Sequence, residues 1–316
     1  MKRNVLIAGA GQLGSRYLQS LTSSTAHLDI YLYSLDPQSY EVCSKRWIEA
    51  GGTFLHHKIV NQLSLDNLPP ALDLVVVSST AESRPNLVEQ ISLRSRVSYW
   101  LLEKVLAQNS EGMAHLELVT SGAKATWVNY YRTSEVLYKS VKSHLLSKNT
   151  EFMRVLGHNW GLACNALHFI HLYAWLFESQ LISVNTQGLS GEWHESKRPR
   201  NFEVFGELIA EFANGGRLSL VANPGPVEYS ITLKNSSHTW FIDEDNGIAE
   251  RSDGLKIEAR IPFQSERKLL DEILSVGKCD LPSLGSVVIA DQIYINAMLN
   301  HWQLHKDSLA SKVPIT

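Results

Sequence analysis

Asn4–Leu18 reads NVLIAGAGQLGSRYL, which is a short apolar run, a complete G-x-G-x-x-G and the start of a helical pattern. This order predicts a strand, a tight turn and a helix. Gly9 allows the backbone angles of the turn, Gly11 lets the main chain approach a pyrophosphate, and Gly14 lets the helix pack closely on the strand. A pyrophosphate would lie on the free N–H groups and positive dipole end of the helix that begins near Gln12.

The context of the motif favours a dinucleotide site over a glycine-rich turn with no ligand. The motif follows a buried-looking strand and precedes a second strand, Leu28–Ser34, at the spacing of a βαβ unit. The residues predicted to bind the dinucleotide here are Gly9, Gly11, Gln12, Leu13 and Gly14.

The end of the second strand bears on the choice of cofactor. An acidic side chain at this position normally binds the ribose hydroxyls of NAD, but the sequence has Ser34, followed by Asp36. Ser34 leaves room for a 2′-phosphate, yet no Lys or Arg follows until Lys45. We predict that Ser34 contacts the cofactor, and both NAD and NADP remain open.

Composition excludes several classes of function. The 316 residues carry a net charge of -3, which gives no basic surface for nucleic acid or a membrane. No apolar run is long enough for a membrane span, and Met1–Arg3 leads directly into a strand, so we expect no signal peptide. Cys43, Cys164 and Cys279 do not form a disulfide framework. We therefore expect a cytoplasmic protein with a small-molecule substrate.

The order of predicted elements indicates two domains. Strands alternate with helices over roughly the first 120 residues, which predicts a doubly wound parallel sheet. Beyond Arg132, strand-like stretches are separated by turn signals such as Asn214–Gly216. The predicted fold is α/β, with a Rossmann domain over 1–121 and an α+β domain over 122–316 whose open sheet is mostly antiparallel. An open sheet leaves a face for a second subunit, so we expect a homo-oligomer.

Two predicted strand ends carry polar residues at the edge of the sheet where α/β proteins bind ligands. Ser79 and Thr80 follow the buried run 72–77 and are predicted to contact the cofactor, although small residues are also ordinary in such loops. Glu103 and Lys104 follow the strand 97–102, and we place both at the cofactor. Lys104 can hold a substrate hydroxyl and relay its proton, whereas the alternative is a surface lysine paired with Glu103.

A helix predicted over 164–177 places Cys164, His168 and His171 on one face, at i, i+4 and i+7. His168 at that position suits a general acid or base, and His171 suits a buried structural histidine. A zinc site would need a fourth ligand, for which His158 is the nearby candidate, so we predict no metal.

Together these features resemble the glucose-fructose oxidoreductase and inositol dehydrogenase family (Gfo/Idh/MocA). The matching features are Gly9-x-Gly11-x-x-Gly14, the buried strand 72–80, the Glu103–Lys104 pair and the helix with His168-x-x-His171. The resemblance implies a two-domain enzyme that moves hydride between NAD or NADP and a sugar, sugar-nucleotide or polyol carbon. It also implies that Lys104 is the catalytic lysine and His168 the catalytic histidine.

The sequence departs from the family pattern near both catalytic residues. Val105 replaces a proline, and Cys164 and His171 replace two aspartates of an Asp-x-x-x-His-x-x-Asp motif. These departures leave open a nicotinamide-binding sensor or assembly protein with little catalysis. The residues predicted to line the substrate pocket, with packing as the alternative role, are Arg132, Asn159, Trp160 and Asn165.

Overall fold

The computed structural model describes residues 2–53, 57–145 and 152–316. The chain forms two compact units. The first contains the chain up to Ala107, Gly112–Asn129 and Pro262–Leu284, and the second contains Gln108–Glu111, Tyr130–Ile261 and Gly285–Thr316. The sequence predicted a single boundary after residue 121. The two units are instead divided at several positions, because the late segment Pro262–Leu284 belongs to the first unit.

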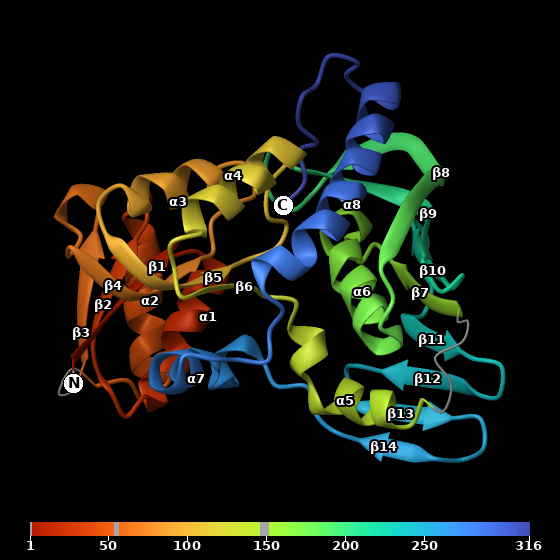
Figure 1. Ribbon diagram of the computed structural model, residues 1–316, viewed down its shortest axis with the longest axis horizontal. Helices are drawn as coiled ribbons and strands as arrows, with labels where there is room; N and C mark the ends of the chain where they lie inside the picture. Colours follow the sequence, from red (N-terminus) through yellow and green to blue (C-terminus); the bar gives the residue numbers. More distant parts are fainter. Residues whose placement is uncertain (1, 54–56, 146–151) are drawn as a thin grey trace. The chain divides into compact units, whose positions relative to one another are not determined.

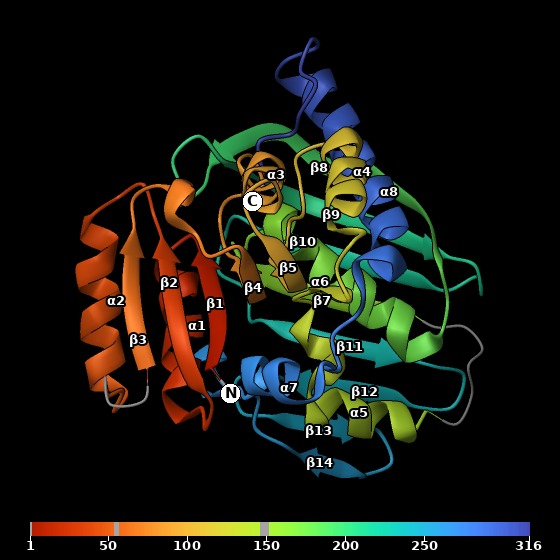
Figure 2. The same cartoon turned by 60° about the vertical axis from the view of Figure 1, so that its left-hand side comes forward.

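A six-stranded parallel sheet forms the centre of the first unit (Figure 1). Its strands are, in spatial order, β3 (His57–Gln62), β2 (His27–Tyr33), β1 (Lys2–Ala8), β4 (Ala71–Val77), β5 (Arg96–Leu102) and β6 (Ala125–Val128). Figure 2 shows β3, β2, β1 and β4 side by side, and the strand order reverses between β1 and β4. This is the predicted doubly wound parallel sheet, and its switch point lies at β1.

Helices cover both faces of this sheet. α1 (Gln12–Ser20) and α2 (Gln38–Glu49) lie on one face, whereas α3 (Arg84–Ser92) and α4 (Ser110–Thr120) lie on the other (Figure 1). Right-handed crossovers produce this division because the chain moves outward from β1 in both directions. The central strands are buried on both sides, and Leu74–Val77 has no exposed surface.

A late segment of the chain completes the first unit. It contains the short helix η4 (Gln264–Glu266), which contacts α1, and α7 (Leu269–Val276), which contacts β4. The main-chain N–H of Val128 in β6 donates to the oxygen of Pro282 at 3.0 Å, which fastens the end of the segment to the sheet.

An eight-stranded sheet forms the second unit, and only its β7–β10 pair is parallel among the pairings of the described residues. Its strands are, in spatial order, β14 (Lys256–Glu258), β13 (Ile248–Arg251), β12 (Thr239–Asp243), β11 (Ser230–Lys234), β7 (Phe152–His158), β10 (Arg217–Asn223), β9 (Phe202–Phe212) and β8 (Leu181–Glu195). The predicted, mostly antiparallel sheet is confirmed.

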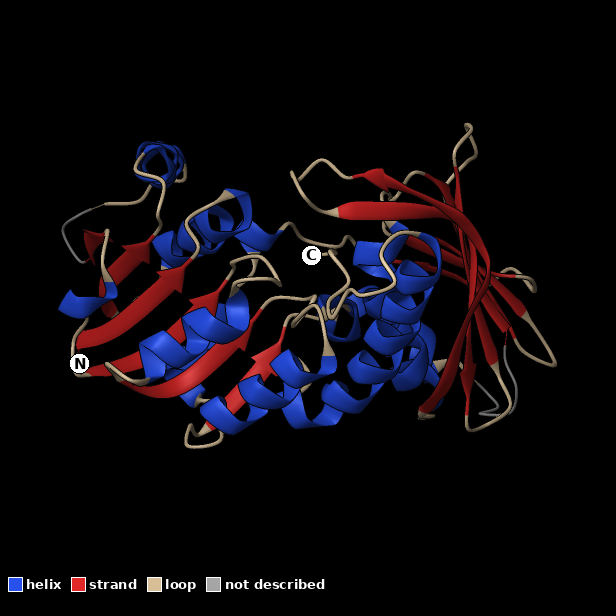
Figure 3. Cartoon of the chain, turned by 90° about the horizontal axis from the view of Figure 1, so that it is seen from above, coloured by secondary structure: helices blue, strands red, loops and turns tan. Residues whose placement is uncertain are grey.

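The helices of the second unit gather on one face of this sheet. α6 (Leu162–Phe177) and α8 (Leu284–His305), labelled in Figure 1, lie on that face, and the opposite face carries no helix in the part of the chain that the structure describes (Figure 3). β7 accordingly alternates between buried and accessible residues. The helix α5 (Val136–Ser143) begins after η3 (Tyr131–Ser134). The predicted hairpin turn at Asn214–Gly216 joins β9 to β10, and Gly215 there has a φ of +80°.

None of the helices in the described ranges has both the length and the apolar character that crossing a membrane requires.

Candidate functional site

The glycine-rich loop lies at the switch point of the parallel sheet. The N–H of Gly9 donates to the oxygen of Tyr33 in β2 at 2.9 Å, and the N–H of Ser78, directly after β4, donates to Ala8 at 2.9 Å. The Ser78 hydroxyl also donates to the oxygen of Gly9 at 2.7 Å. The loop is thus fixed between its two neighbouring strands, at the edge where open α/β sheets bind ligands.

The three glycines of the motif differ in what surrounds them. A Cβ on Gly9, whose φ is +108°, would lie 2.8 Å from the carbonyl carbon of Ser78, and a Cβ on Gly14 would lie 2.0 Å from the oxygen of Gly9. Folding therefore requires both residues to be glycine. A Cβ on Gly11 would meet nothing within 4 Å among the described residues. Folding gives no reason for a glycine there, whereas a bound phosphate does.

The N-terminus of α1 is suited to an anion. Gly11 is its N-cap, no side chain caps it, and its first turn, which includes Gln12 and Leu13, contains no acidic residue. Arg46 of α2 reaches this turn and donates to the side chain of Gln12 at 2.6 Å and to its main-chain oxygen at 3.2 Å. The sequence analysis did not identify Arg46, because its position beside the loop depends on how α2 packs on α1.

Asp36, which follows β2, accepts hydrogen bonds from the first turn of α2. Its carboxylate accepts from the N–H of Gln38 at 3.0 Å and from the hydroxyl of Ser39 at 3.3 Å. Its own N–H donates to the Ser34 hydroxyl at 3.1 Å. Ser34 and Asp36 therefore form one short turn directly after β2, and the predicted contact of Ser34 with the cofactor stays a prediction.

A buried arginine connects the loops that follow β4 and β5. Arg84, the first residue of α3, donates to the main-chain oxygens of Ser79 and Val105 and, at 3.1 Å, to that of Leu106. The peptide bond between Lys104 and Val105 is cis. Arg84 thus holds the segment directly after Lys104, and the sequence offered no signal for this role beyond an arginine near a strand end.

The carboxyl group of Glu103 points into the interior of the first unit. It accepts hydrogen bonds from the hydroxyl of Tyr17 in α1 and, at 2.7 Å, from the amide of Asn129. Burial raises the pKa of Glu103, and the hydrogen bonds from Tyr17 and Asn129 oppose that rise. Burial, and then the charge of Glu103, hold the pKa of Tyr17 well above its usual value. Glu103 therefore anchors the chain next to Lys104, and its predicted cofactor contact stays a prediction.

His171 of α6 contacts a carboxylate that comes from α8. Nε2 of His171 lies 2.6 Å from Oδ1 of Asp291, and the hydroxyl of Tyr130 donates to Oδ2 of the same carboxylate at 2.6 Å. The ring centroid of Tyr130 lies 4.0 Å from that of His171 and 5.8 Å from that of His168. Tyr131 packs edge-on against His168 with centroids 5.2 Å apart. Asp291 is fully buried, and no motif in the sequence pointed to it.

The loop before α6 is shaped by polar contacts. Glu203 of β9 accepts from the N–H groups of Ala163 and Cys164 at 2.7 and 3.2 Å, which caps the helix. Asn165 donates to the oxygen of Trp160 at 2.9 Å, and the indole N–H of Trp160 donates to Val221 in β10 at 2.8 Å. The side-chain N–H groups of Asn165 and Trp160 thus donate to main-chain oxygens of the protein, and the predicted contacts of both residues with substrate stay predictions.

Two residues of this loop have left-handed backbones, namely Asn159 with a φ of +42° and Gly161 with +74°. The tight loop therefore presents Asn159 directly before the helix that carries His168. The role predicted for Asn159 in substrate binding stays a prediction.

Arg132 makes a paired contact with Glu244. Its Nε and one terminal nitrogen donate to the two carboxylate oxygens at 2.7 Å each, and the hydroxyl of Tyr138 donates to the same carboxylate at 2.7 Å. The guanidinium also lies over the ring of Phe169 at 4.3 Å. Arg132 therefore has a clear packing role in the second unit, and its predicted contact with substrate stays a prediction.

Cys164, His168 and His171 are not arranged as a metal site. Nε2 of His171 faces Asp291, and Nδ1 of His158 lies 2.9 Å from the oxygen of Gly225. Across residues 2–53, 57–145 and 152–316, no group of three or more His, Cys, Asp and Glu side chains is placed to hold a metal ion.

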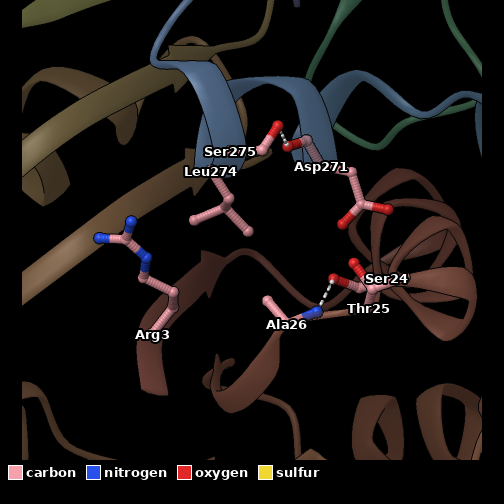
Figure 4. A pocket seen from close by; sticks show the side chains of 7 residues that line it. All are labelled: Arg3, Ser24, Thr25, Ala26, Asp271, Leu274 and Ser275. Atoms are coloured by element: carbon pink, nitrogen blue, oxygen red, sulfur yellow. Dashed lines mark hydrogen bonds between the residues drawn. The ribbon is translucent and has the colours of Figure 1, made fainter. Parts of the chain in front are cut away.

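A cavity of about 300 Å³ lies elsewhere in the first unit (Figure 4). It is lined by Arg3, Ser24, Thr25, Ala26, Asp271, Leu274 and Ser275. Arg3 is at the amino end of β1 and donates to Asp73 at 2.8 Å. The cavity is therefore at the opposite edge of the parallel sheet from the glycine-rich loop, and its arginine is already paired.

Comparison with known proteins gives a match in fold. No protein-family model matches the sequence, and no curated protein matches it in sequence. Among solved structures, biliverdin reductase from Synechocystis sp. PCC 6803, in complex with biliverdin and NADP+, has a TM-score of 0.71 at 15% identity over 93% of this chain and 97% of that one. The chain has the fold of an oxidoreductase of this type.

Two further structures agree. Myo-inositol dehydrogenase from Lactobacillus casei, in complex with NAD(H) and myo-inositol, has a TM-score of 0.68 at 13% identity over 97% of this chain and 96% of that one. UDP-N-acetylglucosamine 3-dehydrogenase GnnA from Acidithiobacillus ferrooxidans has a TM-score of 0.68 at 10% identity over 97% of this chain and 98% of that one. The predicted resemblance to the Gfo/Idh/MocA family is confirmed in the fold.

Proposed function

We propose that the chain is an NAD(P)-dependent oxidoreductase that transfers hydride to or from a hydroxyl or keto carbon of a sugar, a sugar nucleotide or a polyol. The glycine-rich loop is the observation that carries this proposal. Gly11 is the one glycine of the motif that folding does not require, and it precedes a helix N-terminus that no side chain caps. Both features suit the pyrophosphate of a dinucleotide.

The residues proposed to hold the cofactor surround this loop. The pyrophosphate would bind the main chain of Gly9–Gly14, including Gln12 and Leu13, with the charge of Arg46 nearby. Ser34 would face the adenine ribose, and the chain at Ser79, Thr80, Glu103 and Lys104 would lie at the nicotinamide end. The structures with NADP+ and NAD(H) bound support a nicotinamide cofactor of one kind or the other.

Lys104 and His168 are the proposed catalytic residues. In the oxidation direction the carbinol C–H bond breaks, its electron pair and hydrogen pass as hydride to the nicotinamide ring, and the C–O bond becomes a carbonyl. Lys104 would donate a hydrogen bond to the reacting oxygen, and His168 would accept the proton that this oxygen loses. Arg132, Asn159, Trp160 and Asn165 are the proposed neighbours of the substrate, in addition to the packing contacts described above.

We also propose that the protein is a homo-oligomer that uses the open face of the eight-stranded sheet. Its outward residues include the exposed hydrophobic side chains of Phe152 and Phe241. Light scattering coupled to gel filtration tests this proposal, since a monomer at micromolar concentration would contradict it.

A nicotinamide-binding protein with little catalysis is the second candidate. The observation that favours it is the replacement of two carboxylates of the motif by Cys164 and His171. Fluorescence titration with NADH and, separately, NADPH is the first experiment. Saturable binding followed by turnover in a screen of sugars, sugar nucleotides and polyols supports the enzyme, and binding without turnover supports the second candidate. A folded protein that binds neither cofactor contradicts both.

A further inference from the structure

We infer that Asp291 is a positioning residue for His168 and that it acts through Tyr130 and His171. The inference rests on the proposed function, because it assigns Asp291 a part in placing the proposed acid or base. It concerns three elements of the second unit, which are α6, α8 and the chain directly before η3.

The first argument is the cost of burying Asp291. Its side chain has no exposed surface, and it lies on α8 among buried hydrophobic residues such as Val288, Tyr294 and Ile295. A carboxylate in such surroundings costs several kcal/mol unless strong hydrogen bonds compensate, and a hydrophobic residue of similar size is often as stable or more so. Packing alone therefore does not explain an aspartate at this position.

The second argument is what the carboxylate holds. Its two oxygens lie 2.6 Å from Nε2 of His171 and 2.6 Å from the hydroxyl of Tyr130, so each oxygen fixes a different ring. A carboxylate accepts hydrogen bonds, which assigns a proton to Nε2 of His171. The two rings are also tilted by only 30° at a centroid distance of 4.0 Å. Asp291, His171 and Tyr130 therefore form a closed triangle of contacts.

The third argument is the link to His168. The ring planes of Tyr130 and His168 are nearly perpendicular, at 89°, and their centroids lie 5.8 Å apart. The ring of Tyr131 packs against the same imidazole with an interplanar angle of 67° and a centroid distance of 5.2 Å. A displacement of Tyr130 would therefore remove one of the two aromatic rings that pack against His168. Cys164 and His171 stand four residues before and three residues after His168, so the carboxylate on this side of the helix comes from α8, 120 positions after His171.

The test compares three variants of the full chain. Asp291→Asn removes the charge, and Tyr130→Phe removes one hydrogen bond but keeps the ring. Tyr138→Phe is the matched control, because Tyr138 is also a buried tyrosine of the second unit whose hydroxyl donates to a carboxylate, that of Glu244 at 2.7 Å. Thermal unfolding of all three measures the purely structural effect of each change.

The first readout needs no activity. It is the Cε1–H resonance of His168 in a 1H–13C spectrum, assigned through its absence in His168→Gln. We expect this resonance to shift or split in Asp291→Asn and Tyr130→Phe and to stay unchanged in Tyr138→Phe. An unchanged resonance in the first two variants overturns the inference, and so does an equal shift in the control. If Asp291→Asn does not fold, Tyr130→Phe decides the outcome.

The second readout is kinetic and applies once a substrate is found. We expect kcat to fall about 10–100-fold in Asp291→Asn while the Kd for the reduced cofactor stays within about twofold, since a misplaced acid or base affects the chemical step. An unchanged kcat in both variants overturns the inference. If the wild-type protein binds no nicotinamide cofactor, the proposed function fails, and the spectra still decide whether Asp291 positions His168.

Discussion

The guanidinium of Arg84 donates a 3.1 Å hydrogen bond to the main-chain oxygen of Leu106, two residues after Lys104. The same side chain reaches the oxygens of Val105 and Ser79, so one buried cation ties together the loops after β4 and β5. Arginine suits this role better than lysine, because its planar fork presents several donors at once. The position of Lys104 thus depends on a residue of α3.

Arg84→Met should destabilise the protein by about 2–5 kcal/mol, because it leaves three main-chain oxygens without this donor. Arg84→Lys should recover only part of the loss. Urea denaturation measures both effects. Arg94→Met is the control, since that partly exposed guanidinium contacts Asp66 at the surface and should contribute no more than about 1 kcal/mol. Equal losses for Arg84→Met and Arg94→Met would contradict the role assigned to Arg84.

Gly11→Ala should separate folding from cofactor binding. A Cβ at Gly11 meets no described atom within 4 Å, so we expect the stability to change by less than about 1 kcal/mol, whereas the Kd for NADH or NADPH should rise at least about tenfold. Gly14→Ala should destabilise the fold itself, because its Cβ would lie 2.0 Å from the oxygen of Gly9. Cofactor titration and urea denaturation are the measurements. Unchanged cofactor affinity in Gly11→Ala would argue against the pyrophosphate position.

Lys104→Ala should lower turnover by about 10²–10⁴-fold while the cofactor Kd changes little, because the lysine is proposed to act on the substrate oxygen. Steady-state kinetics and fluorescence titration of the same preparation measure the two quantities. Lys58→Ala, at an exposed lysine of β3, is the control and should behave as wild type. Full turnover in Lys104→Ala would remove this lysine from the mechanism.

Glu103 should make the protein less stable as the pH rises. Burial raises its pKa in the folded state above the ordinary value of about 4.5, so between these two values the folded chain holds a proton that the unfolded chain has lost. The free energy of unfolding therefore decreases as the pH rises from about 4.5 through the raised pKa. Glu103→Gln cannot ionise and lacks this decrease.

Relative to wild type, Glu103→Gln should thus become progressively more stable as the pH rises from about 4.5 through the raised pKa of Glu103. Urea denaturation at several pH values provides the comparison. A stability difference that is constant with pH would show that Glu103 has the same pKa in the folded and unfolded chain.

The sequence predicted the elements whose signals are local. The glycine motif, the buried strand β4 and the turn at Asn214–Gly216 identified both sheets, because glycine placement and continuous β-branched runs act over a few residues. Arg84, Arg46 and Asp291 were missed because each has at least one partner 21 or more positions away in the chain. Asp291 lies 120 positions from His171, and a single aspartate within a long helix has no pattern that distinguishes it. The return of Pro262–Leu284 to the first unit was missed for the same reason.

That return has a consequence for synthesis of the protein on the ribosome. A nascent chain that ends at Asn129 already contains all six strands of the parallel sheet, but it lacks η4, which contacts α1, and α7, which contacts β4. Leu270 and Ile273 of α7 are buried in the finished unit, so the surface that they cover is exposed to water until they have been translated. Most of the second unit is made before the first is complete, and a chaperone that recognises apolar surface has that interval in which to bind.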